Sequence, residues 1–322
     1  MSKIYILHEN PEWVTPLHAA FEKRGIQAEE WLLDEGSVAF DTPPPAGVFY
    51  NRMSASSHTR GHRFAPELTH AVLNWLTLHG RRVVNGPRAL YLEVSKVAQY
   101  AALQAAGIRT PRTRVAVGRD AVVEAARSFA PAPFILKPNR GGKGLGVRLF
   151  STAEEAEAYL ASDEAAGEAP IDGLWLIQDY IRSPEPFITR CEFVDGRFHY
   201  AVRVETGGSF ELCPADVCAI DKKPNSSAPA VNFTITGDVD CALIASYERF
   251  LRANEIEIAG IEFIRDANGQ VFTYDVNTNT NYNADAERKA HLAETGMEAI
   301  ARFLSSELDA LLETSQEIIA AE

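Results

Sequence analysis

The chain has 322 residues, of which 46% are hydrophobic and 23% charged, a composition typical of a globular protein with two or three domains. Its net charge of −13 excludes the broad basic surface that binding to nucleic acid requires, and it disfavours attachment to an anionic membrane surface. A small anionic ligand is compatible with this charge, because a local cluster of lysine and arginine is enough to bind it.

The cysteines and the N-terminus indicate the compartment. The four cysteines show no C-x-x-C spacing, so reduced thiols are expected instead of disulfides at Cys191, Cys213, Cys218 and Cys241. The apolar run "KIYIL" is too short for a signal peptide, and no stretch approaches the roughly 20 apolar residues of a membrane span. We therefore expect a cytoplasmic protein without a transmembrane segment.

Residues 1–90 alternate between strand-like and helix-like segments. Strands are predicted at "KIYIL", "IQAEEWLL" and "VFYNRM", and a helix at "EWVTPLHAAFEKRG", ending at Gly25. This β-α-β alternation predicts an α/β domain with an open, Rossmann-like parallel sheet. A domain boundary is predicted near residue 90.

Residues 91–173 form the second predicted domain. An amphipathic helix starting near Leu90 is expected to end at Gly107. The segments "RTRVAVG" and "PFILKP" are predicted strands around a helix at about 119–129, and "GVRLF" is a further strand. Ser151 and Glu154 are predicted to form the capping box of the next helix.

Residues 174–322 form the third predicted domain. A strand is expected at "LWLIQDYI", and β-hairpins are expected to turn at Asp195-Gly196 and at Asn268-Gly269. A helix is predicted over "DCALIASYERFLRAN", and the tail from Ala284 to Ile318 is mainly helical. Residues 207–232 lack periodicity, so a long loop beside an acceptor substrate is expected there.

The segment "FILKPNRGGKGLGVRLF", residues 134–150, is similar to a phosphate-binding loop. It fits neither the P-loop nor the dinucleotide fingerprint, because Val147 follows Gly146. Since it joins two strands, we predict that glycine backbone N–H groups fold over a ligand; a mobile surface hairpin is the alternative. Lys137, at the end of a buried strand, calls for an anionic partner unless its ammonium reaches solvent.

The hairpin over residues 259–277 carries two acids that repel each other. A two-residue turn at Asn268-Gly269 would place Glu262 directly opposite Asp275, at the roughly 4.5–5.5 Å where like charges are destabilising. A divalent cation bound by Glu262, Asp275 and Asn277 would offset this repulsion, and a solvated strand face is the alternative. The run "NTNTNYN" that follows has poor β propensity, which favours a functional role.

Two arginines are predicted to converge on the 190s hairpin. Pairing about Asp195-Gly196 would place Arg190 opposite Ala201 and make Arg203 its diagonal neighbour on the same face. Two guanidiniums there would suit a carboxylate or a transferring phosphoryl group, although surface salt bridges explain them equally well. His58 and His62, spaced i, i+4, have no further metal ligands near them, and no G-x-S-x-G motif indicates a nucleophile.

Together these motifs resemble the ATP-grasp superfamily, in particular its RimK-like branch of ligases that add glutamate to a ribosomal protein. The similarity runs from about Lys96 to Asn281 and extends more loosely over the first domain. It implies a three-domain fold, α+β in the two ATP-grasp subdomains, with ATP between residues 91–173 and 174–322. It also implies Mg²⁺, or Mn²⁺, held by Glu262, Asp275 and Asn277. The nucleotide contacts that it implies are Lys96, Lys137, Gly141, Gly142, Lys143, Gly144, Gly146, Gln178, Asp179, Tyr180, Ile181 and Glu185.

The resemblance also implies roles around the transferred phosphoryl group. Arg190 and Arg203 are expected to be catalytic, and Glu185 is expected to contact the ribose because Ile188 replaces the family's acid. Arg52 in "YNRM" is expected to bind the acid group of the acceptor, with Asn279 also at the substrate. Thr280-Asn281 replaces the family's Pro-Gly, so the resemblance does not identify the substrates.

The implied reaction joins a small-molecule or peptide carboxylate to an amine through an acyl phosphate and releases ADP and phosphate. The sequence leaves open whether the protein is a homo-oligomer. One alternative is a small-molecule kinase on the same fold, favoured by a basic cluster at Arg60, Arg63, Arg81 and Arg82. The other is a non-catalytic protein that only binds ATP.

Overall fold

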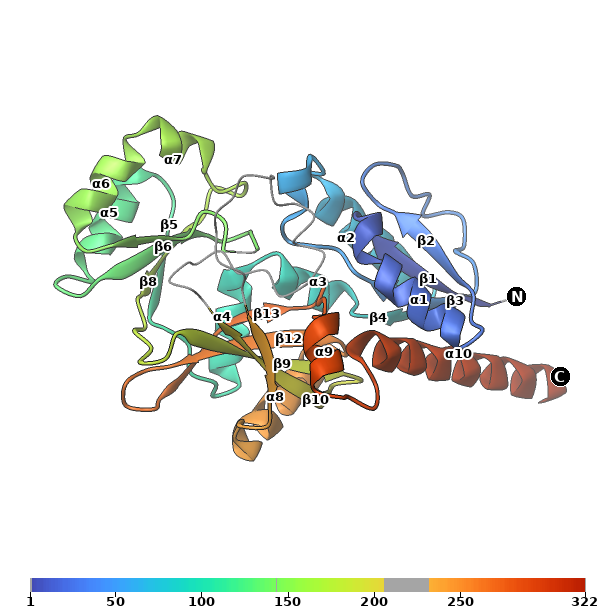
Figure 1. The fold of residues 1–322 in the computed structure, drawn as a ribbon. Helices are drawn as coiled ribbons and strands as arrows, with labels where there is room; N and C mark the ends of the chain where they lie inside the picture. Colours follow the sequence, from blue (N-terminus) through green and yellow to red (C-terminus); the bar gives the residue numbers. More distant parts are fainter. Residues whose placement is uncertain (1, 143, 206–231, 322) are drawn as a thin grey trace.

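The chain folds into three lobes, each built on its own β-sheet (Figure 1). The computed structural model describes residues 2–142, 144–205 and 232–321. The predictions for Lys143, Cys213, Cys218 and the loop over 207–231 therefore lie outside the described residues. The mixed α/β architecture confirms the predicted fold class.

The N-terminal lobe is an open sheet in the order β2-β1-β3-β4, in which every pairing is parallel. The alternation of short apolar strands with helices predicted this arrangement, and β3 is buried along its whole length. The elements are β1 (Lys3–His8), η1 (Pro11–Trp13), α1 (Thr15–Lys23), β2 (Ala28–Leu32), β3 (Gly47–Asn51), η2 (Ser57–Arg60), α2 (Ala65–Leu78) and β4 (Arg82–Val84).

The middle lobe is an antiparallel sheet in the order β5-β8-β6-β7, with aromatic side chains in its core. The strand β8 pairs between β5 and β6, although the predicted boundary at residue 173 assigned it to the third domain. The elements are β5 (Thr113–Ala116), α5 (Arg119–Arg127), β6 (Phe134–Pro138), β7 (Arg148–Phe150), α6 (Ala153–Leu160), α7 (Asp163–Gly167) and β8 (Trp175–Asp179).

The C-terminal lobe is an antiparallel sheet in the order β11-β10-β9-β12-β13. One face packs on α3, α4 and α8, and the other on α10 and the N-terminal lobe, so two apolar clusters enclose it. In Figure 1 the helix α10 runs out beneath the N-terminal sheet. The elements are α3 (Pro87–Glu93), α4 (Lys96–Ala105), β9 (Phe187–Val194), β10 (Arg197–Glu205), β11 (Phe233–Thr236), α8 (Cys241–Ala253), β12 (Ala259–Arg265), β13 (Val271–Asn277), α9 (Ala284–Lys289) and α10 (Gly296–Ala321).

Helix ends differ from the prediction at two places. The single helix predicted from Leu90 to Gly107 is two helices, α3 and α4, because the Ser95 side chain caps α4 by accepting from the Ala98 N–H. The capping box of α6 lies one residue later than predicted. Thr152 Oγ1 accepts from the Glu155 N–H at 3.2 Å, and Glu155 Oε2 accepts from the Ser151 N–H at 2.8 Å.

The register between β9 and β10 contradicts the prediction for the two arginines. Arg190 lies opposite Val202, and Arg203 lies opposite Thr189, because the ladder is irregular between Phe198 and Tyr200. An extra residue in one strand shifts the register by one, and a shift of one moves side chains to the other face. The prediction that both guanidiniums share a face is therefore wrong.

The register between β12 and β13 confirms that Glu262 lies opposite Asp275, although the turn is longer than predicted. The Asp266 N–H donates to the Gln270 carbonyl and closes a loop of three residues, in which Gly269 has φ +75°. A bulge after Glu262 compensates for the longer loop and pairs Phe263 with Thr273. Thr273 consequently leaves the face of Asp275, where it was predicted, and bonds to Tyr247 at 2.7 Å.

Asn85 joins the N-terminal and C-terminal lobes. It is fully buried with φ 55°, and its amide group donates to the carbonyls of Ile258 and Thr278 at 2.7 and 3.0 Å. Its side-chain oxygen accepts from the N–H groups of Glu257 and Ile258. Within the described part of the chain, no helix has the length and apolarity to cross a bilayer.

We expect Asn85→Ala to lower the free energy of unfolding by about 2–4 kcal/mol, because it leaves several buried backbone groups without partners. Urea denaturation of the purified protein measures this loss. The matched control is Asn74→Ala, at an exposed position of α2 where the side chain bonds only within its own helix. The control should change stability by less than about 0.5 kcal/mol; an equal loss in both variants would contradict the role of Asn85.

Candidate active site

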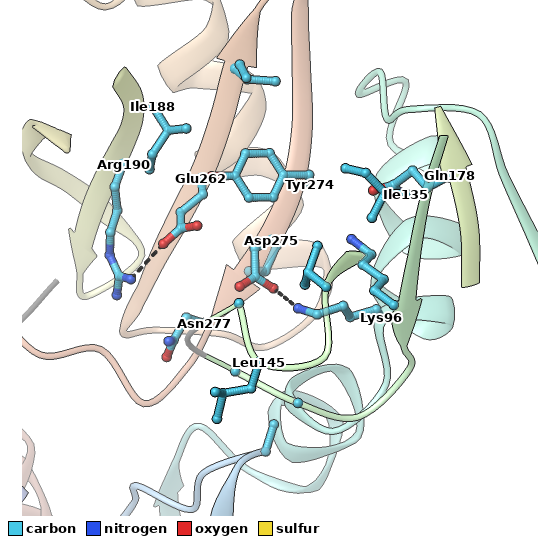
Figure 2. Close-up of a pocket in the computed structure, with 18 of the residues that line it drawn as sticks. Lys96, Ile135, Leu145, Gln178, Ile188, Arg190, Glu262, Tyr274, Asp275 and Asn277 are labelled. Carbon is cyan, nitrogen blue, oxygen red and sulfur yellow. Dashed lines mark hydrogen bonds and ion pairs between the residues drawn. The ribbon is translucent and has the colours of Figure 1, made fainter. Parts of the chain in front are cut away.

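A cavity of about 420 Å³ lies where the three lobes meet, and Figure 2 shows part of its lining. The C-terminal sheet supplies charged side chains on one side, and the middle lobe supplies the glycine-rich hairpin on the other. The N-terminal lobe closes one end. The residues that line the cavity include Trp13, Ser54, Ser56, Lys96, Lys137, Gly142, Arg190, Glu262, Asp275, Asn277, Asn279 and Asn281.

The three predicted metal ligands come together on β12 and β13. Figure 2 shows that each carboxylate is paired with a cation: Asp275 accepts from Lys96 Nζ at 2.5 Å, and Glu262 accepts from Arg190 Nη1 at 3.0 Å. The side-chain oxygen of Asn277 is buried and has no hydrogen-bond partner in the described structure. Buried amide oxygens are rarely left in this state, and Mg²⁺ prefers oxygen ligands, so the three side chains fit a divalent cation.

The amide is needed to complete this set of ligands. Among residues 2–142, 144–205 and 232–321, no group of three or more His, Cys, Asp or Glu side chains could hold a metal ion. Burial raises the pKa of the Glu262 carboxyl. The nearby Asp275 raises this pKa further, and the Arg190 guanidinium lowers it. Burial disfavours the charged form of Lys96, but the Asp275 carboxylate outweighs this and raises the pKa of Lys96. Lys96 is therefore held in its charged form, whereas the net effect on Glu262 favours its neutral form.

Arg190 is the centre of a buried network that the sequence did not reveal. It is 1% exposed; its Nε donates to Glu192 at 2.6 Å and its Nη2 donates to Thr280 Oγ1 at 2.6 Å. Thr280 in turn donates to Glu192 at 2.8 Å. A Cβ on Gly260 would lie 2.4 Å from this guanidinium, so glycine is required there. The i, i+2 spacing of Arg190 and Glu192 on one strand was the available signal.

Lys137 lies beside the cavity without a negatively charged partner in the described part of the chain. It is 6% exposed, and its Nζ donates to the hydroxyl of Tyr100 at 2.6 Å. That hydroxyl donates onward to the Tyr274 carbonyl at 2.9 Å. A buried ammonium with only a neutral partner is suited to an anionic ligand.

The glycine-rich segment connects β6 to β7 as predicted, so it is a strand–hairpin–strand unit. Gly141, Gly142 and Gly144 line the cavity, and a Cβ on Gly142 would lie 3.5 Å from Ser56 of the N-terminal lobe. Gly146, with φ +71°, packs on Pro138. The hairpin therefore spans the cavity between the middle and N-terminal lobes.

The end of the cavity toward β8 is largely apolar. The predicted nucleotide contacts Gln178, Asp179, Tyr180, Ile181 and Glu185 all line it. The Gln178 amide is already used, since it donates to Thr113 Oγ1 at 2.8 Å. Sequence reasoning missed the apolar wall that Ile135, Ile188, Ile264 and Tyr274 add. This end suits a flat aromatic base better than a charged group.

Two arginines predicted at the site lie outside the cavity lining. Arg203 lies on the opposite face of the sheet from Arg190, pairs with Asp238 at 2.7 Å, and stacks over Phe187, which lines the cavity. Arg52 is buried behind Asn279.

The basic cluster proposed for a kinase also does not form. Arg60 is held by Glu9 at 2.5 Å, whereas Arg82 is held by Glu257 and Glu307 at the junction with the C-terminal lobe. Arg63 donates to the Ile171 carbonyl and Arg81 to the Pro44 carbonyl, so the four arginines do not gather in one pocket. His62 bonds to the same Glu9 carboxylate at 2.9 Å.

No family model matches the chain. Over 146 residues it is 25% identical to the D-alanine–D-alanine ligase of Maridesulfovibrio salexigens (41% of this chain, 45% of that protein). Over 153 residues it is 29% identical to a probable alpha-L-glutamate ligase of Teredinibacter turnerae (44% and 49%). The chain thus spans about half the length of the curated relatives that it matches.

Solved structures match nearly the whole chain. The ATP-grasp ligase PsnB in complex with a minimal precursor has a TM-score of 0.68 at 16% identity, over 95% of this chain and 99% of that one. A RimK domain ATP-grasp protein from Sphaerobacter thermophilus has a TM-score of 0.64 at 17% identity, over 94% and 99%. The fold is therefore that of the ATP-grasp proteins, as predicted. One solved structure with this fold and both curated relatives are named as ligases, and another solved structure is a RimK domain protein, as the order of the motifs indicated.

We expect Gly260→Ala to lower stability by about 1–3 kcal/mol, because the new methyl group displaces a guanidinium that three bonds hold in place. Arg190→Ala removes the clashing group. In a double-mutant cycle, Gly260→Ala should therefore cost less in the Arg190→Ala background than in the wild type. Additive losses in denaturation experiments would show that the two positions do not interact.

Proposed function

We propose that the protein is an ATP-dependent carboxylate–amine ligase. The observation that carries the proposal is one cavity in which a set of oxygen ligands faces buried cations beneath a glycine hairpin. The ligands are Glu262, Asp275 and the Asn277 amide oxygen, which has no partner among the described residues. Such an arrangement suits a metal-bound triphosphate, because phosphoryl transfer requires positioning and charge neutralisation and no covalent nucleophile.

In this proposal the adenine occupies the apolar end, and Lys96 and Lys137 contact the phosphates together with the glycine backbone. Bound Mg²⁺, held by Glu262, Asp275 and Asn277, would neutralise charge that develops on the phosphate oxygens. Arg190 Nη1 is the guanidinium donor on the same side as Glu262, where it would orient the transferred phosphoryl group. Arg203 has no part in this scheme, because it lies outside the cavity lining and pairs with Asp238.

The reaction has two steps. An oxygen of the substrate carboxylate attacks the γ-phosphorus, the bond to the β–γ bridging oxygen breaks, and ADP leaves. The amine nitrogen then attacks the carbonyl carbon of the acyl phosphate; the carbon–oxygen bond to phosphate breaks, and the nitrogen loses a proton. Closure of the glycine hairpin over the cavity would keep water from the acyl phosphate.

The relatives support this chemistry. Two are named as ligases of D-alanine and of glutamate, and solved PsnB complexes contain Mg, ADP and a precursor. A kinase on the same fold loses its main support, since Arg60 and Arg82 occupy separate, neutralised positions. The set of Glu262, Asp275 and Asn277 suits Mg-ATP in a ligase and in a protein that only binds ATP, so turnover separates these two.

Replacing a metal ligand should abolish turnover. We expect Asp275→Asn and Glu262→Gln each to reduce phosphate release by roughly 100-fold or more and to raise the Mg²⁺ requirement, since even indirect partners of a metal ligand are worth 10–100-fold. The assay is a phosphate-release screen over paired amino acids with Mg-ATP. The control is Asp309→Asn on the exposed face of α10. Unchanged rate and Mg²⁺ dependence would overturn the assignment of the site.

The products separate the ligase from its alternatives. We expect ADP and phosphate, an amide product, and a hydroxamate when hydroxylamine is added, because hydroxylamine intercepts an acyl phosphate. Chromatography and mass spectrometry of the reaction identify each species. AMP and pyrophosphate would contradict the mechanism, and a stable phosphorylated product unaffected by hydroxylamine would establish the kinase instead.

A further inference from the structure

Arg52 carries a buried charge that no acid neutralises. It follows the end of β3, is 2% exposed, and donates to four oxygens, all of them neutral. These are Asn279 Oδ1 at 3.1 Å, the Trp13 carbonyl at 3.0 Å, the Thr280 carbonyl at 2.9 Å and Asn281 Oδ1 at 2.7 Å. No carboxylate of the described residues lies within ion-pair distance. Burying a charge without a counter-charge is costly, so a site for an anion nearby would explain the arrangement.

The bonds to Arg52 determine which way two asparagine amides point. A guanidinium has only N–H donors, so it must face the amide oxygens, and the usual ambiguity between amide O and N does not arise. The NH₂ groups of Asn279 and Asn281 therefore lie on the side away from those bonds. Neither NH₂ group bonds to another described residue, and both side chains line the cavity. Asn279 is 5% exposed, so little of its surface besides the cavity side is available.

Arg52 therefore acts on a ligand indirectly, through the two asparagine side chains. A donor bonded to an amide oxygen polarises the amide and strengthens its NH₂ group as a donor. Two such groups present four N–H bonds at the end of the cavity that Trp13, Ser54 and Ser56 enclose. The cations that line the cavity in the described chain, Lys96, Lys137 and Arg190, belong to the proposed phosphate end.

We propose that Arg52, Asn279 and Asn281 form a clamp for a substrate carboxylate that is not the one phosphorylated. Asn279 and Asn281 make the contacts, and Arg52 is a positioning residue that supplies charge through them. That this carboxylate belongs to a substrate rests on the proposed function. The clamp replaces the expected direct contact of Arg52 with the acceptor. A carboxylate accepts hydrogen bonds on both oxygens, which matches two donor groups held side by side by one guanidinium.

The decisive variant is Asn279→Asp. It keeps the size of the side chain and the oxygen that accepts from Arg52, but it replaces the NH₂ donor with a negatively charged oxygen. Asn281→Asp is a second, independent variant of the same kind. The matched control is Asn268→Asp, at the exposed tip of the β12–β13 hairpin.

The first measurement needs no turnover. With Mg²⁺ and a non-hydrolysable ATP analogue bound, acetate should raise the melting temperature of the wild type more than chloride at equal ionic strength or acetamide does. The same excess should appear in Asn268→Asp and be lost in Asn279→Asp and Asn281→Asp. Equal stabilisation of wild type and both clamp variants by acetate, or none in the wild type, would overturn the clamp.

The second measurement uses turnover of amines supplied as the free amino acid or as its carboxamide. The wild type should favour the acid in kcat/KM by about 10–100-fold, the range of one or two charge-assisted hydrogen bonds. Asn279→Asp should reverse the preference, because a carboxamide can donate to the new carboxylate. A loss of fold alone would lower both rates without reversing their ratio.

The two proposals fail separately. If no substrate pair yields ADP and an amide but the acetate effect is present and lost in both clamp variants, the ligase function is wrong and the clamp stands. If the ligase is active but Asn279→Asp keeps the wild-type preference for the acid and the wild-type response to acetate, the clamp is wrong and the function stands.

Discussion

Glu262 and Asp275 face each other across β12 and β13, and the surrounding structure compensates for their mutual repulsion. The two compensating cations come from different elements: Lys96 begins α4, and Arg190 lies on β9. Because α4 packs on the same sheet and is capped by Ser95, the ammonium is delivered to a fixed point. In the proposed complex a divalent cation takes over part of this compensation, with the Asn277 oxygen as its third ligand.

Two fully buried arginines show how charge is distributed around this pair. Arg190 has carboxylate partners in Glu192 and Glu262, so it adds little net charge to its surroundings. Arg52 has only neutral oxygens around it and leaves a positive charge behind the asparagines. The first arrangement suits a group that must be held rigidly beside the phosphates, and the second suits the capture of an anion.

The main contribution of the N-terminal lobe is to position parts of the site, and it supplies few reactive groups. Asn85 ties it to the backbone of Ile258, just before β12, and of Thr278. Glu93 accepts from the Thr278 N–H at 2.6 Å and from the Ala55 N–H at 3.3 Å. Burial raises the pKa of the Glu93 carboxyl. These bonds hold the chain just after the metal ligands, so the spacing between the proposed metal site and the clamp depends on the junction between lobes.

The sequence by itself determined the local features. Alternating apolar positions identified most strands, and the glycines after Lys137 identified the hairpin, because both depend on residues close in the chain. The order of motifs from Lys96 to Asn277 identified the ATP-grasp fold. The opposition of Glu262 and Asp275 was predicted correctly even though the turn was one residue longer, because the bulge after Glu262 restored the register.

Only the tertiary structure decided which side chains meet. A single irregularity near Tyr200 sent Arg203 to the opposite face from Arg190, and a bulge of this kind has no reliable signal in one sequence. The sequence could not show that Arg52 lies behind Asn279, or that Glu192 supports Arg190, because those contacts join segments whose positions depend on how the three sheets pack. Hydrophobic periodicity and motif spacing are local properties of the sequence. Which buried charges pair with each other depends on the whole fold.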